Sequence, residues 1–508
     1  MAQPSDKLAK SLEALQALQD SGVVAIRARD VSRTHRERLS RSGFLQEVMK
    51  GWYIPTKPDE PQGESTAWYT SYWRFLASYL RHRFGKDWCL SPEQSLALHT
   101  GNWTVPQQLL VRSKSKARNN VTNLPHGTSL LDIRGVIPRE RDIEDLEGLR
   151  VFSLPAALIA AGPKTFRHFP TDLRTALSTI RSSSEVLDRL LEGGHSIVAG
   201  RLAGAFRNIG RERIADEILK TMRAADFGVR EVDPFEDQRV HLLTPREVSP
   251  YVNRIRLVWQ RMRQSIPAGL PDPPGLPNDR EAYLQRVDDE YVTDAYHSLS
   301  IEGYRVSPEL IERVRSGDWN PDANETDRRN RDALAARGYW QSHQRVKESI
   351  RRVLGGTNPG EVVDQDHGDW YRELFGPSVT AGILQPSDLA GYRNAPVYIR
   401  ESMYVPPRSE AVRDAMPAFF DLLREEQEPT VRIVLGHFVF VYIHPYMDGN
   451  GRMGRFLMNV MMAAAGYPWI VIPVEHRTVY MDALEKASVE QDITSLVNFM
   501  NELLSRQR

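Results

Sequence analysis

The strongest constraint on this chain is a polar, glycine-bearing loop that lies between two apolar segments near the C-terminus. The apolar segments run from Val431 to Ile443 and from Phe456 to Ala465, and the loop spans His444 to Arg455. Apolar runs of this length are typical of buried helices, and a polar loop between two of them usually marks a site. The sequence therefore predicts a helix, a functional loop and a second helix.

The loop contains the residue types that bind phosphate. Gly449 and Gly451 flank Asn450, which lets the backbone form a tight nest of N–H groups at the start of the following helix. Arg452 and Arg455 are three residues apart, so they share one helix face, and their guanidinium groups match phosphate oxygens. A site for several phosphates is expected.

Two further side chains of the loop suggest a reaction. Asp448 supplies a hard oxygen ligand that suits Mg²⁺, which usually bridges phosphates through one or two carboxylates. His444 precedes the loop, and an imidazole with a reference pKa near 6.5 suits a general base. Together the residues predict nucleotidyl or phosphoryl transfer from a nucleotide to a hydroxyl group.

The string His-Pro-aromatic-x-Asp-Gly-Asn-Gly-Arg-x-x-Arg resembles the full signature of the Fic family, and the resemblance extends over residues 280–504. It implies a mostly α-helical enzyme that transfers AMP from ATP to a protein hydroxyl. Tyr446 stands where phenylalanine is commonest, a change that should keep the ring in the core. The Gly-Asn-Gly form resembles the AMP-transferring branch of the family.

The resemblance also implies a role for each residue of the loop. His444 would deprotonate the target hydroxyl, and Asp448 would hold Mg²⁺. ATP would be bound by the following residues. The backbone at Gly449 and Gly451 would form the anion hole, and the Asn450 amide would orient the α-phosphate. Arg452 and Arg455 would hold the distal phosphates, and Tyr480 would lie beside the adenine.

A second stretch resembles the target-binding flap of the family. Val397-Tyr398-Ile399-Arg400 and Met403-Tyr404-Val405 are separated by Glu401-Ser402, which predicts a β-hairpin. Such a flap presents a strand edge to which a target segment can add by backbone hydrogen bonds. The expected acceptor is therefore a protein segment with a Ser, Thr or Tyr hydroxyl.

A third stretch resembles the inhibitory helix of autoinhibited Fic proteins. Ser298-Leu299-Ser300-Ile301-Glu302-Gly303 ends a helix-like run, and Gly303 is a natural helix terminator. The resemblance implies that Glu302 pairs with Arg455 in the place of the γ-phosphate, while Ser298 supports the end of the helix. ATP could then bind only in an unproductive pose.

The N-terminal residues 1–60 have the element order of a small winged helix and resemble the module of abortive-infection type antitoxins. Between residues 27 and 57, eight Lys and Arg residues stand against three Asp and Glu residues. This local basic excess predicts a phosphate-contacting surface, which would make DNA a partner. The alternative is an arginine-rich solvated face on a protein-docking module.

The chain has 508 residues, which predicts a multidomain protein. We expect a winged helix at 1–60, an antitoxin-like α+β domain at 61–245, a helix with a Pro-rich linker at 246–278 and an all-α Fic domain at 279–508. Within the second domain, strands are predicted near 109–112 and 130–133, and helices at 170–191 and 211–227.

Composition limits the classes of partner. Lys and Arg total 66 and so do Asp and Glu, so nucleic-acid binding must be local. The single cysteine, Cys89, is expected in the core and fits a cytoplasmic protein, and no apolar run of membrane-spanning length is present. The sequence is compatible with a homo-oligomer.

Three functions fit these observations. The first is an autoinhibited protein adenylyltransferase that uses ATP and Mg²⁺. The second keeps the fold but reverses the chemistry, with Glu302 orienting a water that removes AMP from a modified protein. The third is a transcriptional regulator in which the C-terminal domain senses nucleotide and the N-terminal module binds DNA.

Overall fold

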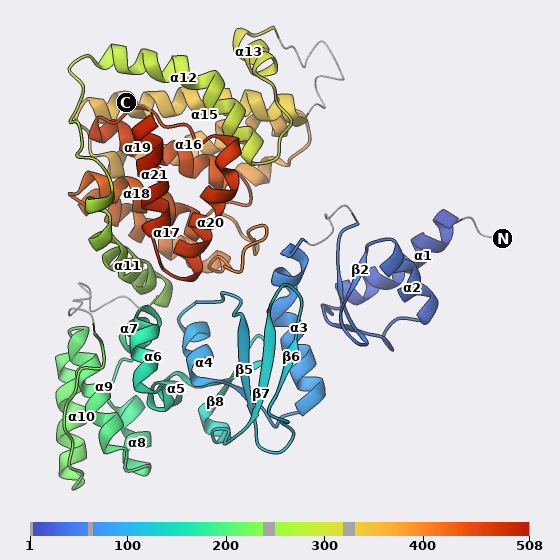
Figure 1. Ribbon diagram of the computed structural model, residues 1–508, viewed down its shortest axis with the longest axis vertical. Helices are drawn as coiled ribbons and strands as arrows, with labels where there is room; N and C mark the ends of the chain where they lie inside the picture. Colours follow the sequence, from blue (N-terminus) through green and yellow to red (C-terminus); the bar gives the residue numbers. More distant parts are fainter. Residues whose placement is uncertain (1–3, 59–63, 237–248, 319–330, 507–508) are drawn as a thin grey trace. The chain divides into compact units, whose positions relative to one another are not determined.

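The computed structural model describes residues 4–58, 64–236, 249–318 and 331–506 (Figure 1). By its contacts the chain divides into two compact units. The first contains Met1–Arg254 together with Tyr398–Val405, and the second contains Ile255–Val397 and Pro406–Arg508. The expected boundaries at 60/61 and 245/246 lie outside the described residues, so the division into four domains stays a prediction.

The first unit begins with a small three-stranded module. Its elements are α1 (Pro4–Asp20), β1 (Ile26–Arg27), α2 (Arg33–Arg41), β2 (Leu45–Met49) and β3 (Trp52–Pro55), and the antiparallel strands have the order β1-β3-β2. Leu15, Ile26 and Leu39 belong to its buried core. The predicted order of elements is observed, and the winged-helix and antitoxin assignments stay predictions.

Several arginines of this module make contacts within it. Arg27 forms an ion pair with Asp30 at 2.8 Å, and the Arg36 guanidinium donates to the Ala28 carbonyl at 2.5 Å. Arg38 donates to the Ser11 hydroxyl at 2.9 Å. Asp30 therefore offsets the charge of Arg27, whereas Arg36 and Arg38 keep their charges but use part of their donors to hold the module together.

The next segment forms a mixed sheet beside a long helix. Its elements are α3 (Thr66–Phe84), β4 (Cys89–Leu90), α4 (Pro92–His99), β5 (Gln108–Ser113), β6 (Asn120–Asn123), β7 (Ser129–Arg134), β8 (Ile143–Leu146) and β9 (Leu149–Phe152). The sheet has the order β4-β5-β7-β6, in which β5 and β7 are parallel, and β8 pairs with β9 separately. The strands predicted at 109–112 and 130–133 are confirmed.

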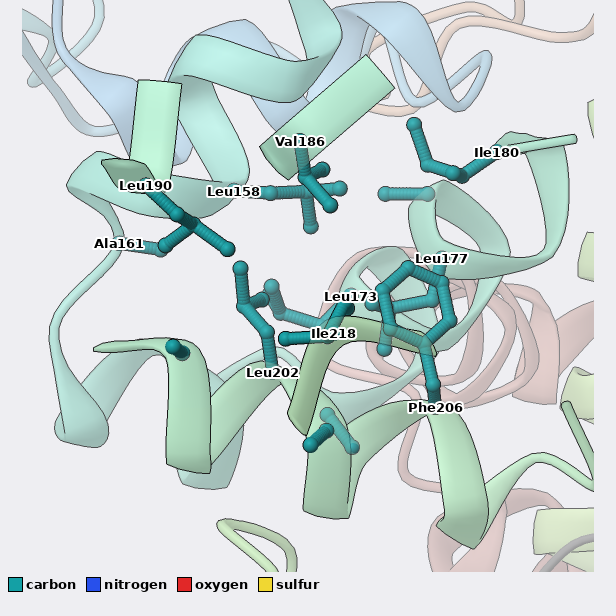
Figure 2. Close-up of a cluster of buried hydrophobic side chains, with 14 of the residues drawn as sticks. Leu158, Ala161, Leu173, Leu177, Ile180, Val186, Leu190, Leu202, Phe206 and Ile218 are labelled. Atoms are coloured by element: carbon teal, nitrogen blue, oxygen red, sulfur yellow. The ribbon is translucent and has the colours of Figure 1, made fainter. Parts of the chain in front are cut away.

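A helical cluster completes the first unit: α5 (Leu154–Ala160), α6 (Pro163–His168), α7 (Pro170–Thr179), α8 (Ser184–Glu192), α9 (Ser196–Asn208) and α10 (Glu212–Ala224). Figure 2 shows Leu158, Leu177 and Phe206 among the side chains that fill its core. Cys89 is buried in this core, as expected, and burial raises the pKa of its thiol to about 12.

The prediction of a single helix at 170–191 is wrong, because the structure has two helices there. Helix α7 ends at Thr179, and α8 starts at Ser184. The Glu185 carboxylate accepts hydrogen bonds from the main-chain N–H groups of Arg181 and Ser182, at 2.7 and 3.0 Å. Serines and acidic residues compete for backbone groups in this way, so they start helices more readily than they continue them.

The described residues of the second unit form helices joined by turns and irregular stretches, and they contain no strand. Its helices are α11 (Pro250–Met262, which spans the division), α12 (Arg280–Ile301), α13 (Pro308–Ser316), α15 (Arg331–Leu354), α16 (Pro359–Thr380), α17 (Ser409–Glu425), α18 (Pro429–Ile443), α19 (Asn450–Ala465), α20 (Arg477–Val489) and α21 (Thr494–Arg506). Short 3₁₀ turns are η2 (Arg263–Ser265), η3 (Pro267–Gly269), η4 (Pro386–Leu389) and η5 (Val474–His476). No described helix has the length and apolar character needed to cross a bilayer.

The Pro-rich stretch at 266–278 packs as a strap against the second unit. The main-chain N–H of Gly275 donates to the Ala465 carbonyl at 3.1 Å, at the end of α19. The Tyr467 hydroxyl donates to the Pro271 carbonyl. Proline supplies no main-chain donor, so this stretch is held by a few contacts of this kind and not by regular secondary structure.

The predicted β-hairpin at 397–405 is not present, since the described residues there form a turn without strands. Ser402 N–H donates to the Ile399 carbonyl at 3.2 Å, and Glu401 has a positive φ of 60°. The Met403 carbonyl accepts from the Val105 N–H at 2.8 Å. Backbone groups that would pair across a hairpin are thus used on the first unit, to which Tyr398–Val405 belong.

Helices α15 and α16 approach so closely that one glycine is required. A methyl group at Gly338 would overlap the Leu374 carbonyl oxygen. We expect Gly338→Ala to lower the free energy of unfolding by about 1 to 3 kcal/mol through overpacking. The matched control is Gly368→Ala on α16, where the flexible Arg372 side chain is the neighbour and helix propensity should add about 1 kcal/mol. Urea unfolding of both variants measures this, and equal stabilities would contradict it.

Candidate functional site

The predicted loop joins α18 and α19, but it is shorter than expected, because α19 begins at Asn450 and includes Arg452 and Arg455. The loop begins at a residue with unusual backbone geometry. His444 follows α18 with φ 53° and ψ 60°, the left-handed conformation that non-glycine residues rarely adopt. Gly449, with φ 80°, then directs the chain into α19. Such backbone conformations persist when surrounding contacts hold them, and they cluster at functional sites.

Arg393 supplies those contacts, and the sequence carried no signal for it because a lone arginine in a loop has no periodic pattern. Its side chain is buried, and Nε donates to the His444 carbonyl at 2.7 Å. Its main-chain N–H donates to the Pro445 carbonyl at 2.9 Å. The other guanidinium nitrogens donate to the carbonyls of Ala395, at 3.2 Å, and Pro407. One arginine thus holds both the histidine loop and the 395–407 segment.

The imidazole of His444 is set up as a proton acceptor. Nδ1 lies 3.2 Å from the Val441 carbonyl, and a carbonyl can only accept, so Nδ1 carries the hydrogen. Nε2 is left with a lone pair. Burial lowers the pKa of His444 to about 4, with Arg393 acting in the same direction, although the Val441 hydrogen bond opposes the shift. The ring is therefore neutral at ordinary pH.

The side chain of Asn450 closes the loop on itself. Its Oδ1 accepts from the Tyr446 N–H at 2.9 Å, and its Nδ2 donates to the Tyr446 carbonyl at 2.8 Å. Tyr446 is buried, as expected, and its ring stacks on Tyr371 with centroids 3.9 Å apart. That Asn450 orients the α-phosphate stays a prediction. The Nδ2 group has two hydrogens, and the one that does not bond to the Tyr446 carbonyl would make this contact.

The end of α12 is formed as the sequence predicts. Gly303 has φ 87°, its N–H donates to the Ser300 carbonyl at 3.0 Å, and the Tyr304 N–H donates to the Leu299 carbonyl at 3.1 Å. These two bonds form a Schellman motif, which ends the helix at Glu302. The Glu302 side chain is thereby aimed at the start of α19.

Glu302 meets Arg455, the contact that the resemblance implied. Arg455 Nη2 donates to Glu302 Oε1 at 2.7 Å, and Arg455 also donates to the Ser298 hydroxyl at 2.7 Å and carbonyl at 3.0 Å. Arg455 is 4% exposed and Glu302 25%. Burial by itself would raise the pKa of Glu302, but the charges of Arg455 and Arg452 outweigh it and lower the pKa, so the carboxylate stays ionised.

The carboxylate of Glu302 lies over the N-terminus of α19. A methyl group at Gly451 would overlap Glu302 Oε1, so only a glycine allows this approach. The first N–H groups of a helix have no partner within the helix, and they attract anions. Glu302 therefore occupies the position where the sequence predicts a phosphate.

Arg452 is held between aromatic rings. Its guanidinium lies 5.2 Å from the ring centroid of Tyr304 and 5.0 Å from that of Phe375, within the range of cation–π attraction. Its Nη2 lies 3.6 Å from an oxygen of Asp448. Both predicted phosphate-binding arginines thus contact the segment around Glu302.

Asp448 fits a metal ion that arrives with a nucleotide. Its side chain is 62% exposed, and Oδ1 accepts from the Gly449 N–H at 2.6 Å. Among the described residues, no group of three or more His, Cys, Asp or Glu could hold a metal by itself. Mg²⁺ usually takes one or two carboxylates plus substrate phosphates, so one exposed carboxylate is sufficient.

Tyr480 lies inside the core and not on an open surface. It is 1% exposed, its hydroxyl is 2.8 Å from His437 Nε2, and its ring stacks near Phe499. Burial raises the pKa of Tyr480 to about 12. Contact with an adenine would require this side chain to become exposed, and that role stays a prediction.

Comparisons with known proteins find similarity in the part of the chain that contains this loop. Residues 366–462 match the Fic/DOC family. Protein adenylyltransferase Fic of Drosophila willistoni is 28% identical over 225 residues, covering 44% of this chain and 40% of that protein. The protein of that name from Culex quinquefasciatus is 29% identical over 233 residues, covering 44% and 43%. The chain thus spans less than half the length of these relatives.

A comparison of structures finds a solved chain of low overall similarity. A fragment of Fic-1 from C. elegans covers 64% of this chain and 92% of its own length, with 18% identity and a TM-score of 0.35.

The low pKa of His444 predicts a specific titration. In the ligand-free protein, we expect ¹⁵N NMR of the ring to show the neutral form with hydrogen on Nδ1 from pH 8 down to about pH 5, because burial disfavours the imidazolium. His444→Gln identifies the resonance. A midpoint near the ordinary value of about 6.5 would contradict the expectation.

Proposed function

We propose that the Fic domain at 366–462 transfers AMP from ATP to a hydroxyl group of a protein, and that Glu302 holds this activity off. The observation that carries the proposal is the bond between Glu302 and Arg455 at 2.7 Å, made at the N-terminus of α19. The name of the relatives, protein adenylyltransferase, supports the reaction type. This chain covers 40% and 43% of the length of these relatives, so we infer only the class of acceptor, a protein hydroxyl group.

In the proposed reaction, His444 Nε2 takes the proton from the acceptor hydroxyl. The hydroxyl oxygen forms a bond to the α-phosphorus, the bond from that phosphorus to the β-phosphate oxygen breaks, and pyrophosphate leaves. Val441 keeps the lone pair on Nε2, and Arg393 holds the backbone of His444 in place. A positioned base of this kind contributes roughly 10² to 10⁴ in rate.

The phosphates would be held by groups that the structure presents together. The free N–H groups at the start of α19, with the glycines at 449 and 451, form a cradle for the α-phosphate. Arg452 and Arg455 would neutralise the distal phosphates. Mg²⁺ bound through Asp448 would supply further charge neutralisation for the phosphates.

The proposed inhibition follows because Glu302 and the γ-phosphate of ATP would compete for the Arg455 guanidinium. Arg455 donates to Glu302 and to Ser298, so a γ-phosphate would have to displace the carboxylate to reach the same guanidinium. Charge-assisted hydrogen bonds of this type contribute about 1.5 to 3 kcal/mol. ATP bound without Arg455 would have its α-phosphate misplaced relative to His444.

The reverse reaction is a second candidate for the same site. Glu302 is ionised and a quarter exposed, so it could orient a water molecule toward an AMP-modified side chain. Incubation of the wild-type protein with its AMP-modified form tests this: AMP release by the wild type, lost in Glu302→Gly, would favour removal over transfer.

Replacement of Glu302 tests the main proposal. We expect Glu302→Gly to raise transfer of label from α-labelled ATP onto the protein itself by about 10- to 100-fold, because Arg455 becomes free. Addition of His444→Ala should abolish that gain. Equal inactivity of the wild type and Glu302→Gly would refute the inhibition, and persistent activity of the double variant would refute the base.

Two serines on α12 provide a matched pair for that experiment. Ser298 accepts from Arg455, whereas Ser300 is two residues away, is partly exposed, and makes no contact with Arg455 among those of the described residues. Ser298→Ala should raise transfer several-fold, and Ser300→Ala should leave it at the wild-type level.

Loss of the carboxylate at 448 tests the metal assignment. In the Glu302→Gly background, we expect Asp448→Asn to raise the Mg²⁺ concentration for half-maximal transfer by about 10- to 100-fold, since a ligand is lost. Asp482→Asn, which changes an exposed carboxylate on α20, is the control. An unchanged Mg²⁺ requirement in Asp448→Asn would exclude this residue as a ligand.

A further inference from the structure

The segment Tyr398–Val405 belongs to the first unit, although the residues on either side belong to the second. The chain leaves the second unit at Val397, packs with the first unit, and returns at Pro406. This is the segment in which the sequence predicts a surface for the acceptor protein. Its contacts therefore bear on how an acceptor could reach the site.

A charged contact holds the tip of this segment. Arg400 donates two hydrogen bonds to the Glu64 carboxylate, at 3.0 and 3.1 Å, and the carboxylate is 7% exposed while Arg400 is 58% exposed. The Thr66 hydroxyl donates to Glu64 at 2.9 Å and accepts from the Glu401 N–H at 3.0 Å. Bidentate pairs between arginine and carboxylate are among the stronger polar contacts.

The rest of the segment is held by its backbone and by apolar packing. The Met403 carbonyl accepts from the Val105 N–H at 2.8 Å. Met403 and Val405 pack against the core cluster that contains Val105, and Tyr404 is buried. Together with the Glu401 N–H, which is bonded to Thr66, the Met403 carbonyl is therefore not open to an extended peptide.

Arg393 connects the ends of this segment to the reacting centre. Its guanidinium donates to the carbonyls of Ala395 and Pro407, which flank the segment, and to the carbonyl of His444. Arg393 thus fixes the residues that flank the segment within the second unit, whereas Glu64, Thr66 and Val105 hold the middle of the segment within the first unit.

We propose that docking of Tyr398–Val405 on the first unit is a second inhibitory contact, which withholds the acceptor-binding segment and acts independently of Glu302. The inference rests on the proposed function. An acceptor chain that adds by backbone hydrogen bonds requires free N–H and C=O groups, and docking occupies the N–H of Glu401 and the carbonyl of Met403. Release of the Arg400 contact with Glu64 frees the segment to receive an acceptor.

The test compares charge-reversal variants in the Glu302→Gly background. The variants are Arg400→Glu, Glu64→Arg and the two combined, with Arg400→Ala as a milder change at the exposed partner. The control is Arg413→Glu, which changes an exposed arginine on α17. Hydrogen–deuterium exchange of residues 398–405 measures docking, and label transfer from α-labelled ATP to casein, a hydroxyl-rich unfolded protein, measures acceptor use.

We expect each single variant to raise both the exchange of residues 398–405 and transfer to casein by about fivefold, and the combined variant to restore both, because the pair re-forms with its charges exchanged. Unchanged exchange in the single variants, or raised exchange without raised transfer, would overturn the proposal. If Glu302→Gly itself transfers nothing, the proposed function falls together with the acceptor role of this segment, while exchange still shows whether the segment docks.

Discussion

The buried charge of Arg455 holds the end of α12 against α19 in the second unit. A buried guanidinium requires acceptors, because an unpaired charge in the protein interior is costly. Here the end of α12 supplies them, through the Ser298 hydroxyl and carbonyl and the Glu302 carboxylate. The same partners stabilise the helix packing and occupy the guanidinium, so the stability of this packing and the proposed inhibition would arise from one set of contacts. A nucleotide phosphate that binds Arg455 would have to replace these acceptors.

The proposed base depends on a different kind of constraint. His444 is held in a left-handed conformation by bonds from Arg393 to the surrounding carbonyls, and its tautomer is set by Val441. The cost of the conformation is met by these contacts. Burial keeps the ring neutral and ready to accept a proton, with a lower intrinsic basicity than an exposed imidazole. Bound phosphates, being negative, would raise that basicity.

Most predictions that hold depend on nearby residues. The loop between two helices and the termination of α12 at Gly303 are observed. The contact of Glu302 with Arg455 is also observed, but it joins residues 153 positions apart and follows from the family resemblance and not from a local pattern. The predictions that fail depend on distant partners. The residues at 397–405 have strand-like alternation but form no hairpin, because Val105 and Thr66 take up their backbone groups. Tyr480, expected beside the adenine, is buried with its hydroxyl bonded to His437, and its role beside the adenine stays a prediction.

The sequence by itself determined the position of the loop between α18 and α19 and the end of α12, because glycines, prolines and closely spaced charges act over a few residues. The tertiary structure alone decided the pKa of His444, the role of Arg393 and the docking of Tyr398–Val405 on the first unit. Each of these depends on burial or on carbonyl groups far along the chain, and any side chain can be adjacent to a carbonyl. The pattern of the sequence carries no information about such neighbours until the chain has folded.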